Sequence, residues 1–177
     1  MGNPPAAPAP PPDVLMRCDV PLAELPFEQF YRDHVDRVHR ALALAVGDAG
    51  VAREATDEAM ARAFARWDRV RRLDNPGGWV FRVGLNWATS WWRKVRRERP
   101  PADDRQPATA APDPAGLAAR SALERLPASR RTVIVCRVLL DLSTAETAAV
   151  LDLTEGTVRS RLSRGLAELR AALAEKE

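Results

Sequence analysis

The sequence is poor in the residues that most often build disulfides and metal sites. It has two cysteines and two histidines among 177 residues. Cys18 lies in a proline-rich stretch and Cys136 in an apolar run, so neither a disulfide framework nor a Cys-rich metal site is available. No stretch approaches the roughly 20 apolar residues of a membrane-spanning helix, and the start has no secretory signal pattern. We expect a cytoplasmic protein with no membrane insertion.

The signatures of an enzyme are also missing. There is no Gly-rich phosphate loop and no set of nucleophile, base and orienting residue. Glu54, Asp57 and Glu58 could form half of a carboxylate metal site, but such sites need a Glu-x-x-His, which the sequence lacks. His34 and His39 are spaced too awkwardly to share one ion. We expect no catalysis and no cofactor, and the carboxylates form either a solvated face or a docking patch for a basic partner.

Proline divides the chain into segments. Eight of the 15 prolines fall in residues 1–26 and five in residues 100–114. We therefore expect a disordered tail over 1–26, a helical domain over 27–99, a flexible linker over 100–115 and a second helical domain over 116–174. Neither block has strand-type alternation, so the predicted fold class is all-α, with two helical domains.

The net charge is only +3, so an anionic partner must be met by local clusters of cations. The first block ends in such a cluster, behind all five tryptophans, which lie between positions 67 and 92. Aromatic rings beside a basic stretch are typical of proteins that stack on unpaired bases. For Trp79 and Trp87 we favour packing in the core, whereas one of the adjacent Trp91 and Trp92 is expected to meet solvent or a partner.

Helix signals give the boundaries within both blocks. The apolar spacing predicts a first helix from Phe27 to Gly47, a second to about Leu73 and a third capped by Asn75. In the second block, Ser143 and Glu146 form a capping box, and a tight turn separates their short helix from a longer one capped by Thr154. This is the spacing of a helix-turn-helix.

In a helix-turn-helix the second helix enters the major groove of DNA with its N-terminal residues against base edges. Val158, Leu162 and Leu166 take the inward face of this helix. The outward side, which can read base edges, is predicted to hold Arg159, Ser160, Ser163 and Arg164. The hydroxyls of Thr154 and Thr157 and the free amides of the helix start suit a phosphate.

Residues 27–172 resemble the bacterial RNA polymerase sigma factors of the extracytoplasmic-function (ECF) group. In the first block EATDEAMARAFARWDRV is similar to the D-x-x-Q-E-x-F-x-R-A helix of that family, and WVFRVGLNWA to its W-L-[FY]-R-I-A-x-N-x-A stretch. In the second block LERLPASRR, LSTAETA and GTVRSRLSRG follow the family order of motifs. The resemblance implies a promoter-recognition subunit that binds core RNA polymerase and promoter DNA, acts at the nucleoid and is held by an anti-sigma factor or another regulator.

The resemblance also implies roles for particular residues. Glu54, Asp57 and Glu58 would dock on polymerase, and the outward side of the last helix would face the minus-35 element. The residues implied at the minus-10 element are Trp79, Phe81, Arg82, Asn86, Arg93, Lys94, Arg96 and Arg97. Two rivals stay open: a helix-turn-helix regulator that works without polymerase, and a sigma-like protein that only sequesters partners.

Overall fold

Helices form all the regular structure in the parts of the chain that the computed structural model describes, which are residues 26–98 and 114–174. Most of the predicted tail and most of the predicted linker lie outside the described residues. The first block forms α1 (Phe27–Val46), α2 (Ala49–Ala65), α3 (Trp67–Val70) and α4 (Pro76–Glu98). The second forms α5 (Pro114–Arg125), α6 (Ala128–Ile134), the π-helical turn η2 (Val135–Leu139), α7 (Thr144–Leu151) and α8 (Glu155–Ala174). The all-α prediction is confirmed.

The helix ends follow the predicted signals. Gly47 ends α1 in the left-handed conformation, with φ of 80°. Asn75 caps α4, because its Oδ1 accepts a hydrogen bond from the Gly78 amide at 2.7 Å. Pro76 then takes the first helical position, where its missing amide hydrogen costs nothing. The NPGG segment is therefore a capped helix start and not a loop.

One predicted helix is broken in two. We expected the second helix to continue to about Leu73, but α2 ends at Ala65 and a single turn, α3, follows after Arg66. Arg66 has non-helical angles of φ −127° and ψ 27°. The break lets Trp67 turn inward, so that its ring lies 4.8 Å from the ring of Phe30. Trp67 thereby packs with Phe27 and Phe30 against the apolar core.

The most buried face of α4 is offset from the one we expected. Val80 and Phe81 are fully buried, and Ala88 and Gly84 lie on the same face. Trp79 and Trp87 are only partly buried and pack against the edge of the core. Gly84 is needed for this close packing, since a Cβ there would lie 2.7 Å from Leu42 Cδ1 on α1.

The second block has a smaller core of its own around the helix-turn-helix. Val133 of α6, Ala148 of α7 and Val158 of α8 form this cluster. A Cβ at Gly165 would lie 2.9 Å from Ile134 Cδ1, so the glycine lets α8 cross close to α6. Helices α6 and α7 thereby hold the predicted reading helix, α8, in a fixed orientation.

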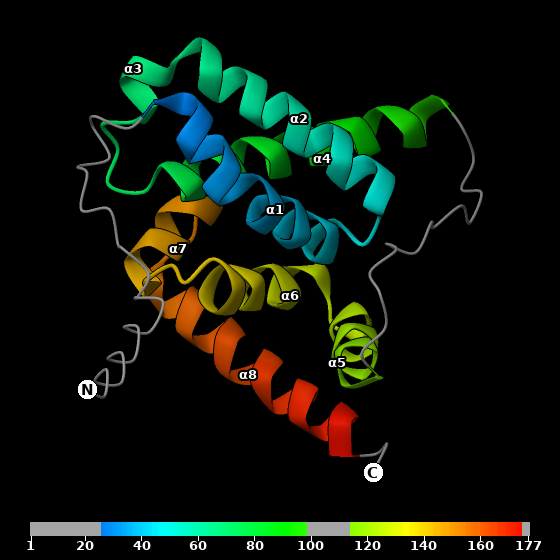
Figure 1. The fold of residues 1–177 in the computed structure, drawn as a ribbon. Coiled ribbons are helices and arrows are strands. Elements are labelled where there is room, and N and C mark those ends of the chain that lie inside the picture. Colours follow the sequence, from blue (N-terminus) through cyan, green and yellow to red (C-terminus); the bar gives the residue numbers. More distant parts are fainter. Residues whose placement is uncertain (1–25, 99–113, 175–177) are drawn as a thin grey trace, which may run out of the picture.

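The two blocks lie directly against each other. In Figure 1, α1, α2 and α4 form the upper layer and α5, α6 and α8 the lower one, with α7 at their junction. The larger apolar core contains side chains of both blocks, among them Phe30 and Leu42 from the first and Cys136 and Leu142 from the second. Two helical units are therefore present as predicted, but in this structure they share one core.

Candidate nucleic-acid interface

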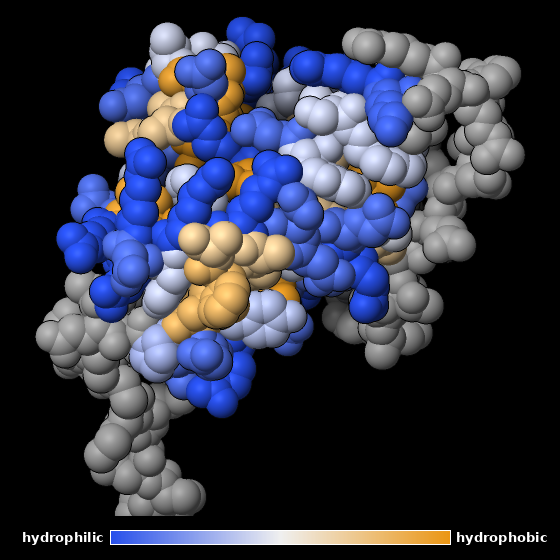
Figure 2. All heavy atoms as spheres, turned by 90° about the horizontal axis from the view of Figure 1, so that it is seen from above, coloured by the Kyte–Doolittle hydropathy of each residue, from blue (hydrophilic) through white to orange (hydrophobic). Residues whose placement is uncertain are grey.

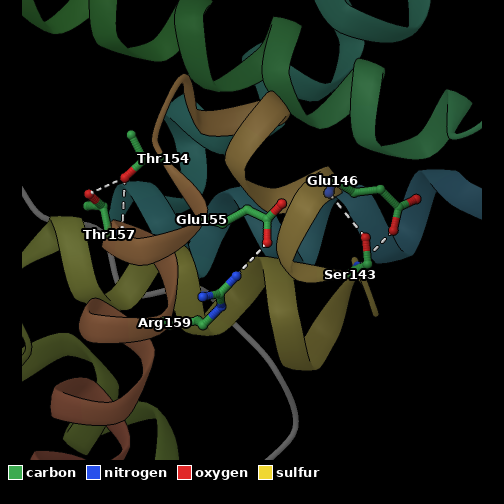
Figure 3. A network of polar contacts seen from close by, with 6 residues as sticks. All are labelled: Ser143, Glu146, Thr154, Glu155, Thr157 and Arg159. Carbon is green, nitrogen blue, oxygen red and sulfur yellow. Dashed lines mark hydrogen bonds and ion pairs between the residues drawn. The ribbon is translucent and has the colours of Figure 1, made fainter.

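The reading helix α8 begins with the cap that the sequence predicts. The Thr157 amide donates a hydrogen bond to Thr154 Oγ1 at 3.2 Å, and the two threonine hydroxyls are 2.9 Å apart. Figure 3 shows both side chains together at the helix start. A Cβ at Gly156 would meet nothing closer than Thr154 Oγ1 at 4.0 Å. A nucleic-acid backbone can thus approach the first amides of α8 without a steric clash.

The outward side of α8 is formed by the predicted residues. Arg159, Ser160, Ser163 and Arg164 are all exposed, while Val158 is fully buried. Arg159 forms an ion pair with Glu155 at 2.7 Å, one helical turn earlier, as Figure 3 shows. Guanidinium groups and hydroxyls on one exposed side of a helix start are suited to the edges of bases in a major groove.

The third arginine of this segment has a different position. Arg161 is half-buried and lines a cavity of about 310 Å³ between the two blocks, together with Trp92 and Leu153. Only Arg159 and Arg164, of the three, therefore lie on the exposed reading side. Arg159 and Arg164 thus belong to the exposed reading side of α8, and Arg161 belongs to the surface that faces the cavity.

Helix α7, which precedes the turn into α8, has a defined cap at each end. Ser143 and Glu146 form the full capping box, since Ser143 Oγ accepts from the Glu146 amide and a Glu146 carboxylate oxygen accepts from the Ser143 amide. Asp152 ends α7 with φ of 55°, the left-handed conformation that Asp tolerates. Hydrogen bonds to Asn75 and Ser143 lower the pKa of the Glu146 carboxyl, so its charged form is favoured.

The second predicted surface lies on α4, and most of its described residues reach solvent. Arg82, Asn86, Arg93 and Lys94 are exposed, and Trp79 is half-buried. Arg96 and Arg97 belong to α4, but their side chains lie outside the described residues. Arg82 Nη1 donates a hydrogen bond to the carbonyl of Ala149 on α7 at 2.9 Å.

Phe81, which we predicted at the minus-10 element, does not lie on the surface of α4. Its ring has an exposed fraction of 0% and lies in the apolar core that both blocks share. Phe81 therefore packs the interior of the protein and cannot contact DNA in this structure. The prediction assigned Phe81 to DNA from its position in the motif alone. In the structure Phe81 faces inward, whereas its neighbour Arg82 faces solvent.

The predicted docking carboxylates lie on the outer face of α2. Glu54 and Asp57 are exposed, and Glu58 is half-exposed and forms an ion pair with Arg62 at 2.7 Å. Within the parts of the chain that the structure describes, no three His, Cys, Asp or Glu residues gather in a way that could hold a metal ion. The structure thus offers no second half for the metal-site alternative in the described ranges.

An exposed aromatic patch, which we did not predict from the sequence, lies beside these carboxylates. Phe64 is 62% exposed, its ring lies 5.1 Å from that of Phe27, and Tyr31 is also exposed. With Asp57 and Met60 these rings line a shallow hollow of about 280 Å³. Figure 2 shows an apolar patch on this face within a hydrophilic surround. Such an exposed patch is typical of a protein interface. The outward position of Phe64 among the charged residues of α2 was the available signal.

His34 and the described cysteine, Cys136, have structural positions. His34 is half-buried, its ring stacks on Phe30 at 4.3 Å, and its Nδ1 is 2.9 Å from the Phe30 carbonyl oxygen. Burial raises the pKa of the Cys136 thiol to about 12, which removes its reactivity as a thiolate. None of the helices in the described ranges has the length and apolar character to cross a bilayer.

A helix-turn-helix with an arginine and serine face turned to solvent places this chain in the class of DNA-binding proteins. Comparison with known proteins narrows the class. The family described as "Sigma-70, region 4" matches residues 116–169. The RNA polymerase sigma-E factor of Streptomyces avermitilis is 32% identical over 157 residues, which cover 86% of this chain and 88% of that protein. The ECF sigma factor SigM of Mycobacterium tuberculosis is 30% identical over 146 residues, covering 81% of this chain and 74% of SigM. The chain belongs to the RNA polymerase sigma factors of the ECF group.

The fold agrees with solved structures of this kind. The sigma factor RpoE from Bartonella quintana, solved with the anti-sigma factor NepR, superposes with a TM-score of 0.71 at 23% identity, over 84% of this chain and 96% of RpoE. CnrH, solved with the cytosolic domain of CnrY, superposes with a TM-score of 0.59 at 25% identity, over 88% of this chain and 94% of CnrH. The likeness to RpoE supports the helical fold over the 84% of this chain that it covers.

Proposed function

We propose that this chain binds core RNA polymerase, recognises two promoter elements through its two helical blocks and helps to melt the DNA at the start of transcription. The observation that carries the proposal is the exposed side of α8, where Arg159 and Arg164 flank two serines at the start of a helix-turn-helix. The first block adds a second helix, α4, which carries exposed cations and partly buried tryptophans. A regulator that binds duplex DNA alone has no use for that second helix.

The upstream element is recognised by α8. Arg159 and Arg164 donate to guanine edges, Ser160 and Ser163 serve as short donors or acceptors, and Thr154 and Thr157 hold a phosphate at the helix start. When Arg159 donates to a guanine, its ion pair with Glu155 must be weakened or broken. An exposed pair of this kind contributes roughly 0.3–0.5 kcal/mol, less than a good base contact, so DNA can displace it.

The downstream element is contacted by α4. The exposed Asn86 and Arg82 and the half-buried Trp79 face the opened strand, and Arg93 and Lys94, continued by Arg96 and Arg97, follow its phosphates. Phe81 has no part in this surface, since it supports the helix from the core.

Polymerase docks on the outer face of α2. The face combines the carboxylates Glu54, Asp57 and Glu58 with the exposed ring of Phe64. An aromatic anchor rimmed by charges is a common arrangement at protein interfaces. The charges here suit a basic partner surface on the polymerase.

Reconstituted transcription tests the proposal. Purified chain plus core polymerase is expected to produce discrete transcripts from a subset of a genomic fragment library, and core polymerase alone is expected to produce none at those starts. Retained binding to polymerase without any transcript across the library would refute the initiation role and favour a sequestering protein. Binding to duplex fragments with no binding to polymerase would favour an independent regulator.

A separate protein partner also belongs to the proposal. RpoE of Bartonella quintana, whose fold this chain shares, was solved with an anti-sigma factor. We infer that an anti-sigma factor or another regulator binds this chain and withholds it from polymerase until it is needed. Co-purification of a tagged chain at its natural expression level, followed by loss of initiation when the purified partner is added back, tests this inference.

A further inference from the structure

Glu155 is the one acidic residue in the stretch from Thr154 to Arg164 that begins the reading helix. It is the first residue of α8, and its side chain is exposed. Its Oε2 accepts a hydrogen bond from Arg159 Nη2 at 2.7 Å. The proposed function gives a task to Arg159 and to the exposed serines of α8, but none to this carboxylate.

The carboxylate lies on the side of α8 that is proposed to enter the major groove. Residues four apart share one face of a helix, so Glu155 and Arg159 are neighbours there, as Figure 3 shows. Glu155 stands one turn nearer to the helix start, and the first residues of the second helix of a helix-turn-helix lie against base edges. When Arg159 reaches a guanine, Glu155 is therefore expected to lie over an adjacent base pair.

A carboxylate in the major groove needs a hydrogen-bond donor. The phosphates on both sides of the groove repel it, and its ion pair with Arg159 is weakened once Arg159 turns to a base. The bases offer donors in this groove only at cytosine N4 and adenine N6, whereas guanine and thymine present acceptors. Adenine places its N7 acceptor beside N6, and that nitrogen repels a carboxylate. Cytosine is therefore the base that best suits Glu155.

The same ion pair weakens binding to the wrong sequence. Arg159 has to leave Glu155 before it can bind a phosphate of unrelated DNA, and the carboxylate then lies among phosphates without a partner. On the matching sequence both side chains find partners, the guanidinium on guanine and the carboxylate on cytosine. The cost of an unpaired charge thus falls only on the wrong sites, which raises specificity.

We propose that Glu155 is a specificity-determining residue of the reading helix. It accepts a hydrogen bond from the N4 amino group of the cytosine beside the guanine that Arg159 contacts, and it disfavours DNA that lacks this cytosine. The inference rests on the proposed function, because it needs α8 to lie in a major groove. It adds a cytosine to the upstream element that none of the contacts assigned above requires.

A purely structural role for Glu155 predicts a different outcome. A carboxylate in the first turn stabilises a helix through the helix dipole, and a glutamate four residues before an arginine adds a weak ion pair. If Glu155 did no more than this, its removal would lower the free energy of unfolding and leave every base preference unchanged. Base preference is therefore the decisive measurement, with unfolding in urea as a separate measure of stability.

The experiment compares wild-type, Glu155→Ala and Glu155→Gln chains, each reconstituted with core polymerase. Their affinities are measured for promoter fragments that carry each of the four bases in turn at every position of the upstream element. The wild type is expected to prefer cytosine at one position about tenfold, and Glu155→Ala is expected to lose this preference alone. Glu155→Gln is expected to prefer adenine there, because a glutamine amide can bond to adenine N6 and N7 together.

Two further variants locate the effect. Arg159→Ala identifies the guanine position, which is expected to adjoin the cytosine position and to differ from it. Glu168→Ala makes the same charge change as Glu155→Ala and also removes an ion pair, with Arg130, but it lies far from the start of α8. This control is expected to keep all base preferences. Unrelated duplex DNA is expected to compete with the promoter about tenfold better for the Glu155→Ala holoenzyme than for that of the wild type.

Base preferences in Glu155→Ala that match those of the wild type would overturn the inference. A change confined to the guanine position would also overturn it, because Glu155 would then act only through Arg159. A wild-type holoenzyme that prefers the guanine but no cytosine beside it would refute the role of Glu155 and leave the proposed function standing. A wild-type holoenzyme with no base preference anywhere in the upstream element would instead refute the proposed function of α8.

Discussion

Replacing Arg164 by alanine isolates one contact between α8 and DNA. Arg164 is exposed and forms no ion pair with another residue of the described ranges. Its removal should therefore leave the free energy of unfolding almost unchanged. A guanidinium that donates twice to a guanine contributes about 1–3 kcal/mol of discrimination, so the variant should bind its upstream element about 5- to 150-fold more weakly.

The assay is the affinity of the reconstituted holoenzyme for promoter fragments found by mapping transcript starts. Each fragment is compared with copies that carry single base changes in the upstream element. Arg164→Ala should lose preference at one or two adjacent positions, while Arg170→Ala, an equal charge change farther along α8, should leave the preferences unaltered. Uniform weakening on all fragments, or loss of polymerase binding, would refute the assignment of Arg164 to base recognition.

Three further predictions concern other parts of the molecule. Phe64→Ala and Asp57→Arg should each weaken binding to core polymerase about tenfold in a titration. Asp36→Arg, the same charge change on α1, should leave that affinity unchanged. If Asp36→Arg weakens binding as much as Asp57→Arg, α2 is not the docking face. Gly84→Ala should lower the free energy of unfolding by about 1–3 kcal/mol in urea, because its methyl group overlaps a leucine of α1, and no loss would show that the helices can part. Glu146 should contribute its full stabilisation above the ordinary pKa of a carboxyl group and lose it as the pH drops through its own lowered pKa. The difference in melting temperature between the wild type and Glu146→Gln should therefore shrink in acid. A difference that stays constant with pH would contradict the hydrogen bonds as the cause of the lowered pKa.

Local signals in the sequence predicted the parts of the fold that depend on a few neighbouring residues. Asn75 and Thr154 cap their helices as expected. Each of these outcomes is decided by a hydrogen bond or a backbone angle within about four residues, which the sequence displays directly. The exposed side of α8 followed in the same way, because Val158 fixes which side faces inward.

The features that the sequence did not reveal depend on distant partners. Phe81 is buried and Phe64 exposed although both are apolar residues on helices with a similar pattern. Which helix covers each of them is a matter of tertiary packing. The break at Arg66 arises because Trp67 packs on aromatic rings of α1, nearly 40 positions earlier. The shared core likewise joins residues whose proximity no periodicity in the sequence encodes.

Footprinting of one promoter with the reconstituted holoenzyme shows which parts of the DNA this chain contacts. We expect that adding this chain to core polymerase protects two zones, one at the upstream element and one at the downstream element, with unpaired bases in the second zone. We also expect that Arg164→Ala weakens protection of the first zone alone. Protection of a single zone, or of none, would contradict a chain that reads both elements at once.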